Sequence, residues 1–127
     1  MKKILSVLTI LCLGIISVDA QINSSLSVEK TTTTQKEIVI EGVGITKTVE
    51  ATGDEVIKIE GTNNKVIITG ACHSIKIEGV DNSVTVDDVK SVSIEGTGNK
   101  VNYKKTSAAN GKLLTAIAGV NNKITKI

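Results

Sequence analysis

From residue 38 onwards, short runs of alternating apolar and polar residues recur about every nine residues. Apolar pairs separated by a single residue follow one another at this interval: Ile57/Ile59, Val66/Ile68, Ile75/Ile77, Val84/Val86, Val92/Ile94 and Val101/Tyr103. Alternation of β-branched residues predicts strands, and the Gly- and Asn-containing segments between the pairs predict turns. Apolar residues at helical spacing are absent from this region. The pattern therefore predicts an all-β fold.

Two of these half-repeats form a unit of about 18 residues, which the tripeptide Ile-Glu-Gly marks. The tripeptide ends at four glycines and has a weaker fifth copy: Gly42, Gly61, Gly79, Gly96 and Gly119. Like residues stack into rows if each unit forms one coil of a solenoid. We therefore predict a small parallel β-solenoid of about 18-residue coils. The alternative is an antiparallel β-meander, because residues 57–68 can also be interpreted as a hairpin around Thr62-Asn63-Asn64.

Two rows of polar residues would run along such a stack. Asparagines follow most of the glycines at the same interval: Asn64, Asn82, Asn99 and Asn122. We expect them to form a structural amide ladder at one corner, as in cross-β structures. The outward row consists of Glu41, Glu60, Glu78 and Glu95, with carboxylates roughly 5 Å apart. Lys58 and Lys76 can neutralise this row; the alternative is a divalent-cation site, since such ions prefer carboxylate oxygens.

The first twenty residues have the three-part pattern of a secretory signal. Met1-Lys2-Lys3 precedes an apolar run of about 15 residues, which is short of the roughly 20 that cross a bilayer. We expect cleavage between Ala20 and Gln21, after a small residue, and no stable membrane span in the mature form. The polar stretch 21–36 is then an N-terminal arm or linker, and residues 37–127 form the β-repeat domain. The expected location is the periplasm, the cell surface or the extracellular space.

Composition narrows the classes of partner. The chain has 15 basic residues, all of them lysines, and 13 acidic ones, for a net charge of +2. This near balance and the lack of arginine, the usual bidentate reader of bases, argue against a nucleic-acid partner. Tyr103 is the only aromatic residue, which counts against stacking sites for sugars or bases.

The sequence contains no convergent set of catalytic residues. Cys72 and His73 are adjacent, and neighbouring strand residues point to opposite faces, so they cannot form a nucleophile–base pair. Cys72 is the only cysteine left after cleavage removes Cys12, and we expect it to be buried. Asp87 and Asp88 are the nearest approach to a carboxylate pair, but Asp88 takes the glycine position of other repeats and is expected in a turn. We expect no catalytic residues and no cofactor.

The phrases Asn82-Ser83-Val84-Thr85-Val86 and Asn99-Lys100-Val101-Asn102-Tyr103 share one pattern, in which a Gly, two or three residues and an Asn precede Val-x-Val or Val-x-Tyr. Over about residues 55–127 this pattern resembles an uncharacterised bacterial family of secreted proteins, domain of unknown function 3060. The resemblance implies an exported β-repeat domain. It supplies no activity and no catalytic residues to transfer.

The last repeat contains an insertion at residues 104–116, and we expect its Leu113 and Leu114 to cover the end of the column. The sequence as a whole predicts an exported, non-catalytic module that presents a flat face to a cell-envelope or extracellular ligand. The partner is then an envelope polysaccharide or a protein. The alternative function is that of a structural protein, in which the solenoids self-associate end to end.

Overall fold

The structure is a computed structural model that describes residues 34–127. It contains eight strands: β1 Glu37–Val43, β2 Thr46–Thr52, β3 Val56–Thr62, β4 Lys65–Val80, β5 Ser83–Thr97, β6 Lys100–Lys105, β7 Leu114–Val120 and β8 Lys123–Lys126. In this part of the chain no helix is long and apolar enough to cross a membrane. The expected cleavage site at Ala20 and Gln21, and most of the stretch 21–36, lie outside the described residues.

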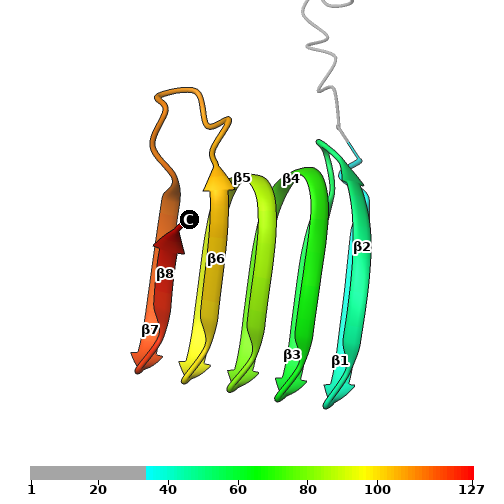
Figure 1. Ribbon diagram of the computed structural model, residues 1–127, viewed down its shortest axis with the longest axis vertical. Helices are drawn as coiled ribbons and strands as arrows, with labels where there is room; N and C mark the ends of the chain where they lie inside the picture. The colour runs from blue at the N-terminus through cyan, green and yellow to red at the C-terminus, as the bar shows by residue number, and fades with distance from the viewer. Residues whose placement is uncertain (1–33) are drawn as a thin grey trace, which may run out of the picture. The chain divides into compact units, whose positions relative to one another are not determined.

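The chain winds in stacked coils, with one strand on each side of every coil (Figure 1). Face A consists of β1, β3, residues 74–80 of β4, residues 91–97 of β5, and β7. Face B consists of β2, the first halves of β4 and β5, β6 and β8. All of these neighbours pair in parallel, and partners on face A are 19, 18, 17 and 23 residues apart. The predicted parallel β-solenoid is confirmed, and the antiparallel meander is excluded.

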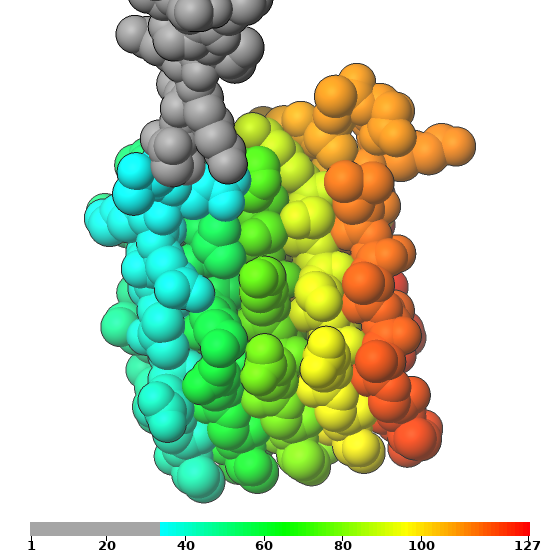
Figure 2. Space-filling view, turned by 180° about the vertical axis from the view of Figure 1, so that it is seen from behind, coloured from blue at the N-terminus to red at the C-terminus, as the bar shows by residue number. Residues whose placement is uncertain are grey.

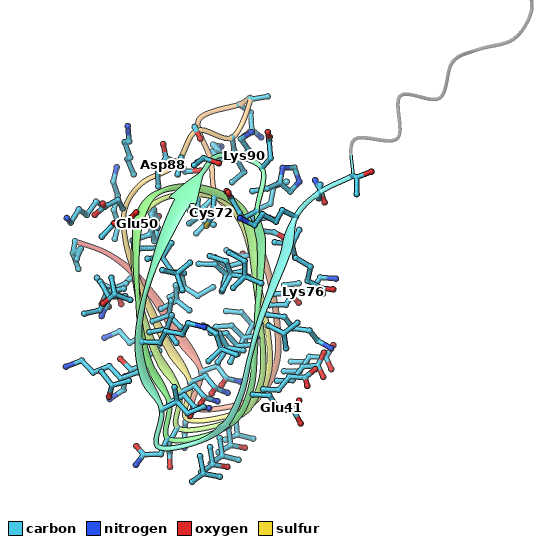
Figure 3. The ribbon with its side chains drawn as sticks, turned by 90° about the vertical axis from the view of Figure 1, so that its right-hand side faces the viewer. Glu41, Glu50, Cys72, Lys76, Asp88 and Lys90 are labelled. Carbon is cyan, nitrogen blue, oxygen red and sulfur yellow. The ribbon has the colours of Figure 1, made fainter. Side chains whose placement is uncertain are left out.

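The interior is a column of branched apolar side chains from both faces (Figure 3). Ile59, Ile77 and Ile94 on face A, and Val66 and Val84 on face B, are each at most 1% exposed. β-Branched side chains suit this position because they pack well on a pleated, buried surface. The alternation in the sequence is therefore the direct cause of the two-faced coil.

Each coil passes from face A to face B through a sharp corner of constant shape. In every coil one corner residue has a φ between 53° and 71°: Gly44, Asn63, Asp81, Gly98 and Asn121. Gly, Asn and Asp adopt this left-handed conformation at the least cost. Two residues earlier stands the repeat glycine, where the backbones of successive coils approach closely: a Cβ on Gly79 would lie 1.9 Å from the carbonyl oxygen of Gly61. The recurring Gly and Asx residues are thus requirements of the corner.

The last coil, formed by β7 and β8, has a neighbouring strand on one side only. Ile117 is consequently 52% exposed, whereas its partner Ile94 in the preceding coil is 0% exposed. Leu113, just before β7, packs against the core but does not cover the end of the column as predicted. The expectation for Leu114 was wrong: it is 59% exposed, because it is the register partner of the outward Ser91.

Candidate functional site

The structure brings the four predicted asparagines together in one row at the corner. The side-chain oxygen of Asn82 accepts a hydrogen bond from the backbone N–H of Asn64 at 3.0 Å, and its Nδ2 donates to the carbonyl of Gly61 at 2.9 Å. Asn99 and Asn122 repeat both bonds one and two coils later. The row satisfies buried backbone groups that would otherwise lack partners. These side chains are occupied by the corner and leave little capacity for a ligand.

The first coil departs from this row in a way that the geometry explains. Ile45 stands where later coils have asparagine, and its backbone N–H donates to the side-chain oxygen of Asn64 at 2.9 Å. Each asparagine side chain bonds the coil before it, and no coil precedes β1 in residues 34–127. An amide at position 45 would therefore lack the glycine carbonyl that the other corners provide.

Face A, which is turned towards the viewer in Figure 2, carries the predicted glutamate row. Glu41, Glu60, Glu78 and Glu95 are successive register partners. Lys58 pairs with Glu60, and its Nζ lies 4.0 Å from a Glu78 oxygen. The hydrogen bond to Glu60, with the charges of both glutamates, raises the pKa of Lys58. The row is therefore a surface of mixed charge.

The geometry gives no support to the divalent-cation interpretation of this row. Among the described residues, no group of three or more His, Cys, Asp or Glu side chains is arranged to hold a metal ion. Stacked carboxylates on a flat face present one oxygen pair per coil, whereas Ca²⁺ prefers six to eight converging oxygen ligands. A flat row does not provide that convergence.

Two shallow hollows lie side by side on face A. The larger, of about 220 Å³, is lined by Ser74, Ile75, Lys76, Ser91, Val92, Ser93, Leu114, Thr115 and Ala116. The smaller, of about 180 Å³, is lined by Lys76, Ile77, Glu78, Ser93 and Glu95. They meet at Lys76 and Ser93. The surface is hollowed here because side-chain size changes along one outward row. The long Lys58 and Lys76 are followed in this row by the small Ser93 and Ala116.

Cys72 and His73 are kept apart by the alternation of β4. Cys72 is fully buried, whereas His73 is partly exposed. Burial, followed by the charges of Asp88 and Glu55, raises the pKa of the Cys72 thiol to about 12. A thiol that stays protonated is a poor nucleophile and a poor metal ligand. Cys72 is therefore a small apolar residue of the core.

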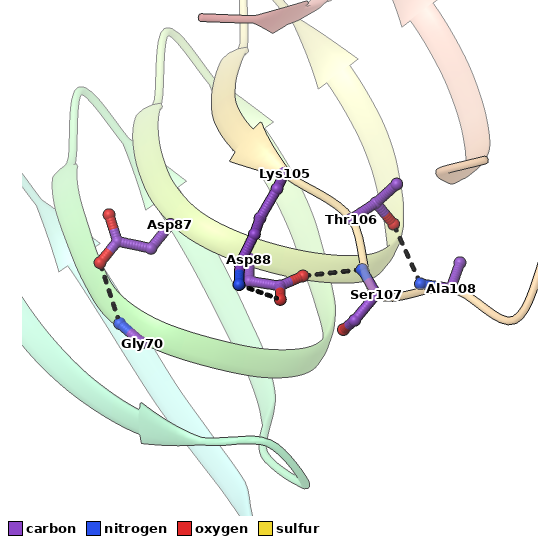
Figure 4. Close-up of polar contacts among 7 residues, drawn as sticks. All are labelled: Gly70, Asp87, Asp88, Lys105, Thr106, Ser107 and Ala108. Atoms are coloured by element: carbon purple, nitrogen blue, oxygen red, sulfur yellow. Dashed lines mark hydrogen bonds and ion pairs between the residues drawn. The ribbon is translucent and has the colours of Figure 1, made fainter. Parts of the chain in front are cut away.

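Asp87 and Asp88 bind different partners (Figure 4). Asp87 accepts a hydrogen bond from the N–H of Gly70 at 3.1 Å and pairs with Lys104 at 2.6 Å. The contact with Lys104, more than that with Gly70, lowers the pKa of Asp87. Asp88 is 5% exposed and accepts a hydrogen bond from the N–H of Ser107 at 2.8 Å. The two carboxylates hold neighbouring segments of backbone and do not converge on a reaction site.

The expectation that Asp88 takes the glycine position of the repeat was wrong. Asp88 is the register partner of Ala71, because an irregularity between Ile68 and Ala71 shifts the pairing at this point. Gly70 lies within this irregularity and has a φ of 83°. The 17-residue coil is therefore one residue shorter than the 18-residue coil before it at this point. Sequence spacing alone cannot locate that deletion.

Glu55 is a buried acidic residue that the repeat pattern did not reveal. It is 4% exposed, and its carboxylate accepts hydrogen bonds from the Thr52 N–H at 2.8 Å, the Thr52 hydroxyl at 2.7 Å and the Gly53 N–H at 3.1 Å. These bonds, above all that from the Thr52 hydroxyl, lower the pKa of Glu55 from 4.5 to about 2. The sequence signal that could have revealed Glu55 is the spacing Thr-x-x-Glu. This spacing lets the Glu carboxylate accept hydrogen bonds from the Thr three residues earlier.

We expect the free energy of unfolding to decrease as the pH falls from about 5 to about 2. The folded-state pKa of Glu55 lies below its unfolded value, so the stabilisation is present above the unfolded pKa and is lost as the pH falls through the folded one. A shift of this size corresponds to about 3 kcal/mol. Thermal unfolding of the native protein and of Glu55→Gln from neutral to acidic pH measures it. The variant should be less stable at neutral pH and less dependent on pH; equal dependence would refute the assignment.

The sequence profile of the family described as Protein of unknown function (DUF3060) matches residues 59–113. This match confirms the family resemblance over that segment. It includes Lys76, Glu78, Ser93 and Glu95, which line the hollows of face A. No curated protein and no solved structure matches the chain significantly.

Proposed function

We propose that this protein is an exported, non-catalytic binding module that uses face A to hold an extended, hydroxyl-rich polymer of the cell envelope or extracellular space. The pair of adjoining hollows on face A carries the proposal. Their walls combine the ammonium group of Lys76, the hydroxyl groups of Ser91 and Ser93, and the carboxylates of Glu78 and Glu95. Sugar hydroxyls both donate and accept hydrogen bonds, so a surface that offers donors and acceptors together suits a polysaccharide.

A repeating ligand fits this face better than a compact one. Equivalent outward residues recur once per coil, at the strand spacing of about 4.8 Å. Tyr103 packs against the core, so face A has no aromatic platform, and affinity must come from hydrogen bonds. Each bond adds little net free energy. Many weak contacts along a polymer can nevertheless sum to useful avidity.

A catalytic role is disfavoured by the same contacts. The thiol of Cys72 is buried and protonated, and the carboxylates of Asp87 and Asp88 are each held by backbone N–H groups. Acid–base chemistry on a ligand requires such groups to reach one reacting centre. The proposal is therefore restricted to binding.

End-to-end self-assembly remains the alternative, and the exposed last coil favours it. Two lysines oppose it. Lys47 in the first coil is the register partner of the buried Val66, and Lys126 in the last coil is the partner of the core-packed Tyr103. A lysine at an inward position of an edge strand is a known means of preventing edge-to-edge association. We therefore favour the binding module.

Titration of the purified protein with cell-wall and extracellular polysaccharides, with and without calcium, tests the proposal. We expect saturable binding that does not need calcium and that weakens about tenfold in Lys76→Ala or Glu78→Gln, as for loss of one charged hydrogen bond. Glu50→Gln, on the opposite face (Figure 3), is the matched control and should bind normally. Calcium-dependent binding would instead give the glutamate row a metal role. Failure of the whole panel would refute a polysaccharide ligand.

A further inference from the structure

A hollow of about 460 Å³ opens at the C-terminal end of the solenoid. Its lining is Tyr103, Thr106, Gly111, Lys112, Leu113, Thr115, Ile117, Ile124 and Lys126. Only Thr115 also lines a hollow of face A. The volume is within the range of about 300–1,000 Å³ that small-molecule sites usually have. The hollow is thus a second, separate candidate for binding.

The apolar part of this surface exists because the coil stack stops at β7 and β8. Ile117 and Ile124 occupy inward positions, as the partners of the buried Ile94 and Val101. In an inner coil the next layer would cover them, but here Ile117 is 52% exposed and Ile124 only partly buried. Leu113 extends the apolar surface from the segment between β6 and β7. An apolar group placed here would be removed from water, which is favourable.

The polar part of the hollow is positively charged. Lys126 continues an inward row whose earlier members, Ile68, Val86 and Tyr103, belong to the core or pack against it. Lys112 lines the same hollow from the segment before β7. No acidic residue is present in the lining. The ion pairs of the described residues involve neither of these lysines. Two cations therefore share an apolar hollow with no acidic side chain in its lining.

We propose that this hollow binds a small amphipathic anion, with an apolar body and a single carboxylate or sulfonate head. The body would contact Leu113, Ile117 and Ile124, and the head would reach Lys112 and Lys126. A second copy of the chain is the poorer occupant, because two C-terminal ends brought together would juxtapose their own lysines. This site goes beyond the polymer-binding proposal for face A and does not depend on it.

Displacement of a fluorescent dye tests the site. The dye 1-anilinonaphthalene-8-sulfonate has apolar rings and one sulfonate, and should bind the intact protein saturably. Decanoate should displace it at a concentration at least tenfold lower than decanol does, and decyltrimethylammonium should not displace it. This order separates recognition of the charge from simple burial of an apolar chain.

Two lysine variants locate the site. Lys126→Gln and Lys112→Gln should each weaken decanoate binding about fivefold to tenfold, as for loss of one charge-assisted contact. Lys47→Gln removes the corresponding inward lysine from the first coil, and should bind decanoate as the native protein does. Circular dichroism confirms that each variant is folded. Equal displacement by decanoate and decanol, equal weakening in all three variants, or no saturable dye binding would each overturn the proposal.

Discussion

Gly96→Ala is expected to lower the melting temperature by roughly 15–30 °C, from a loss of about 3–5 kcal/mol. A Cβ at position 96 would lie 1.9 Å from the carbonyl oxygen of Gly79 in the preceding coil. That oxygen also accepts the hydrogen bond from Asn99 Nδ2 at 2.9 Å. The two coils would have to separate at the corner, and would lose packing and hydrogen bonding together. Differential scanning calorimetry measures the change.

Gly53→Ala is the matched control for this substitution. Both glycines have a φ of 129°, a conformation that side-chain-bearing residues rarely adopt. A Cβ at Gly53 meets no atom within 4 Å. The control therefore carries the conformational cost alone, about 1–2 kcal/mol. Equal losses in Gly53→Ala and Gly96→Ala would show that close approach of the coils contributes nothing.

Asn82→Ala is expected to cost about 2–4 kcal/mol, or roughly 10–25 °C in melting temperature. Asn82 is 1% exposed, and its removal leaves the N–H of Asn64 and the carbonyl of Gly61 without their partners. A buried backbone group that loses its hydrogen bond costs about 1–3 kcal/mol. Water cannot readily replace the amide, because the coils on both sides close the site. Urea unfolding followed by circular dichroism measures the loss.

Asn102→Ala controls for the loss of an asparagine as such. Asn102 lies in β6 between the inward residues Val101 and Tyr103, so its side chain faces outward on face B. Its replacement should change stability by less than about 0.5 kcal/mol. A similarly small effect of Asn82→Ala would mean that the amide row does not stabilise the fold.

Both corner substitutions also bear on the binding that we propose for face A. The larger hollow of face A exists because Lys76, Ser93 and Ala116 are aligned from coil to coil. The corners at which the face A strands end help to hold that alignment. A destabilised corner at Gly96 or Asn82 should therefore weaken binding on face A without touching a residue that lines it.

The residues of the repeat determined the fold class, the coil length and the core. Alternation of β-branched residues decides which side chains point inward, because successive strand residues face opposite ways. Gly, Asn and Asp residues at the same position of each repeat decide where the chain turns, because few other residues accept a backbone with positive φ. Both causes act locally and repeat in every coil. For this reason the glutamate row from Glu41 to Glu95 was also predictable.

Features that depend on several coils at once were decided by the tertiary structure. Asp88 pairs with Ala71 and not with Gly70, because β4 has one residue more than β5 at this point and forms a bulge at Gly70. The larger hollow of face A depends on the register of Ala116. Ala116 lies 23 residues after its partner Ser93, and no repeat specifies the path of the chain between them. The end hollow requires Lys112, before β7, and Lys126, in β8, to line the same surface. Sequence periodicity describes what each coil shares with its neighbours, whereas these sites arise where a coil differs from them or has no neighbour to pack against.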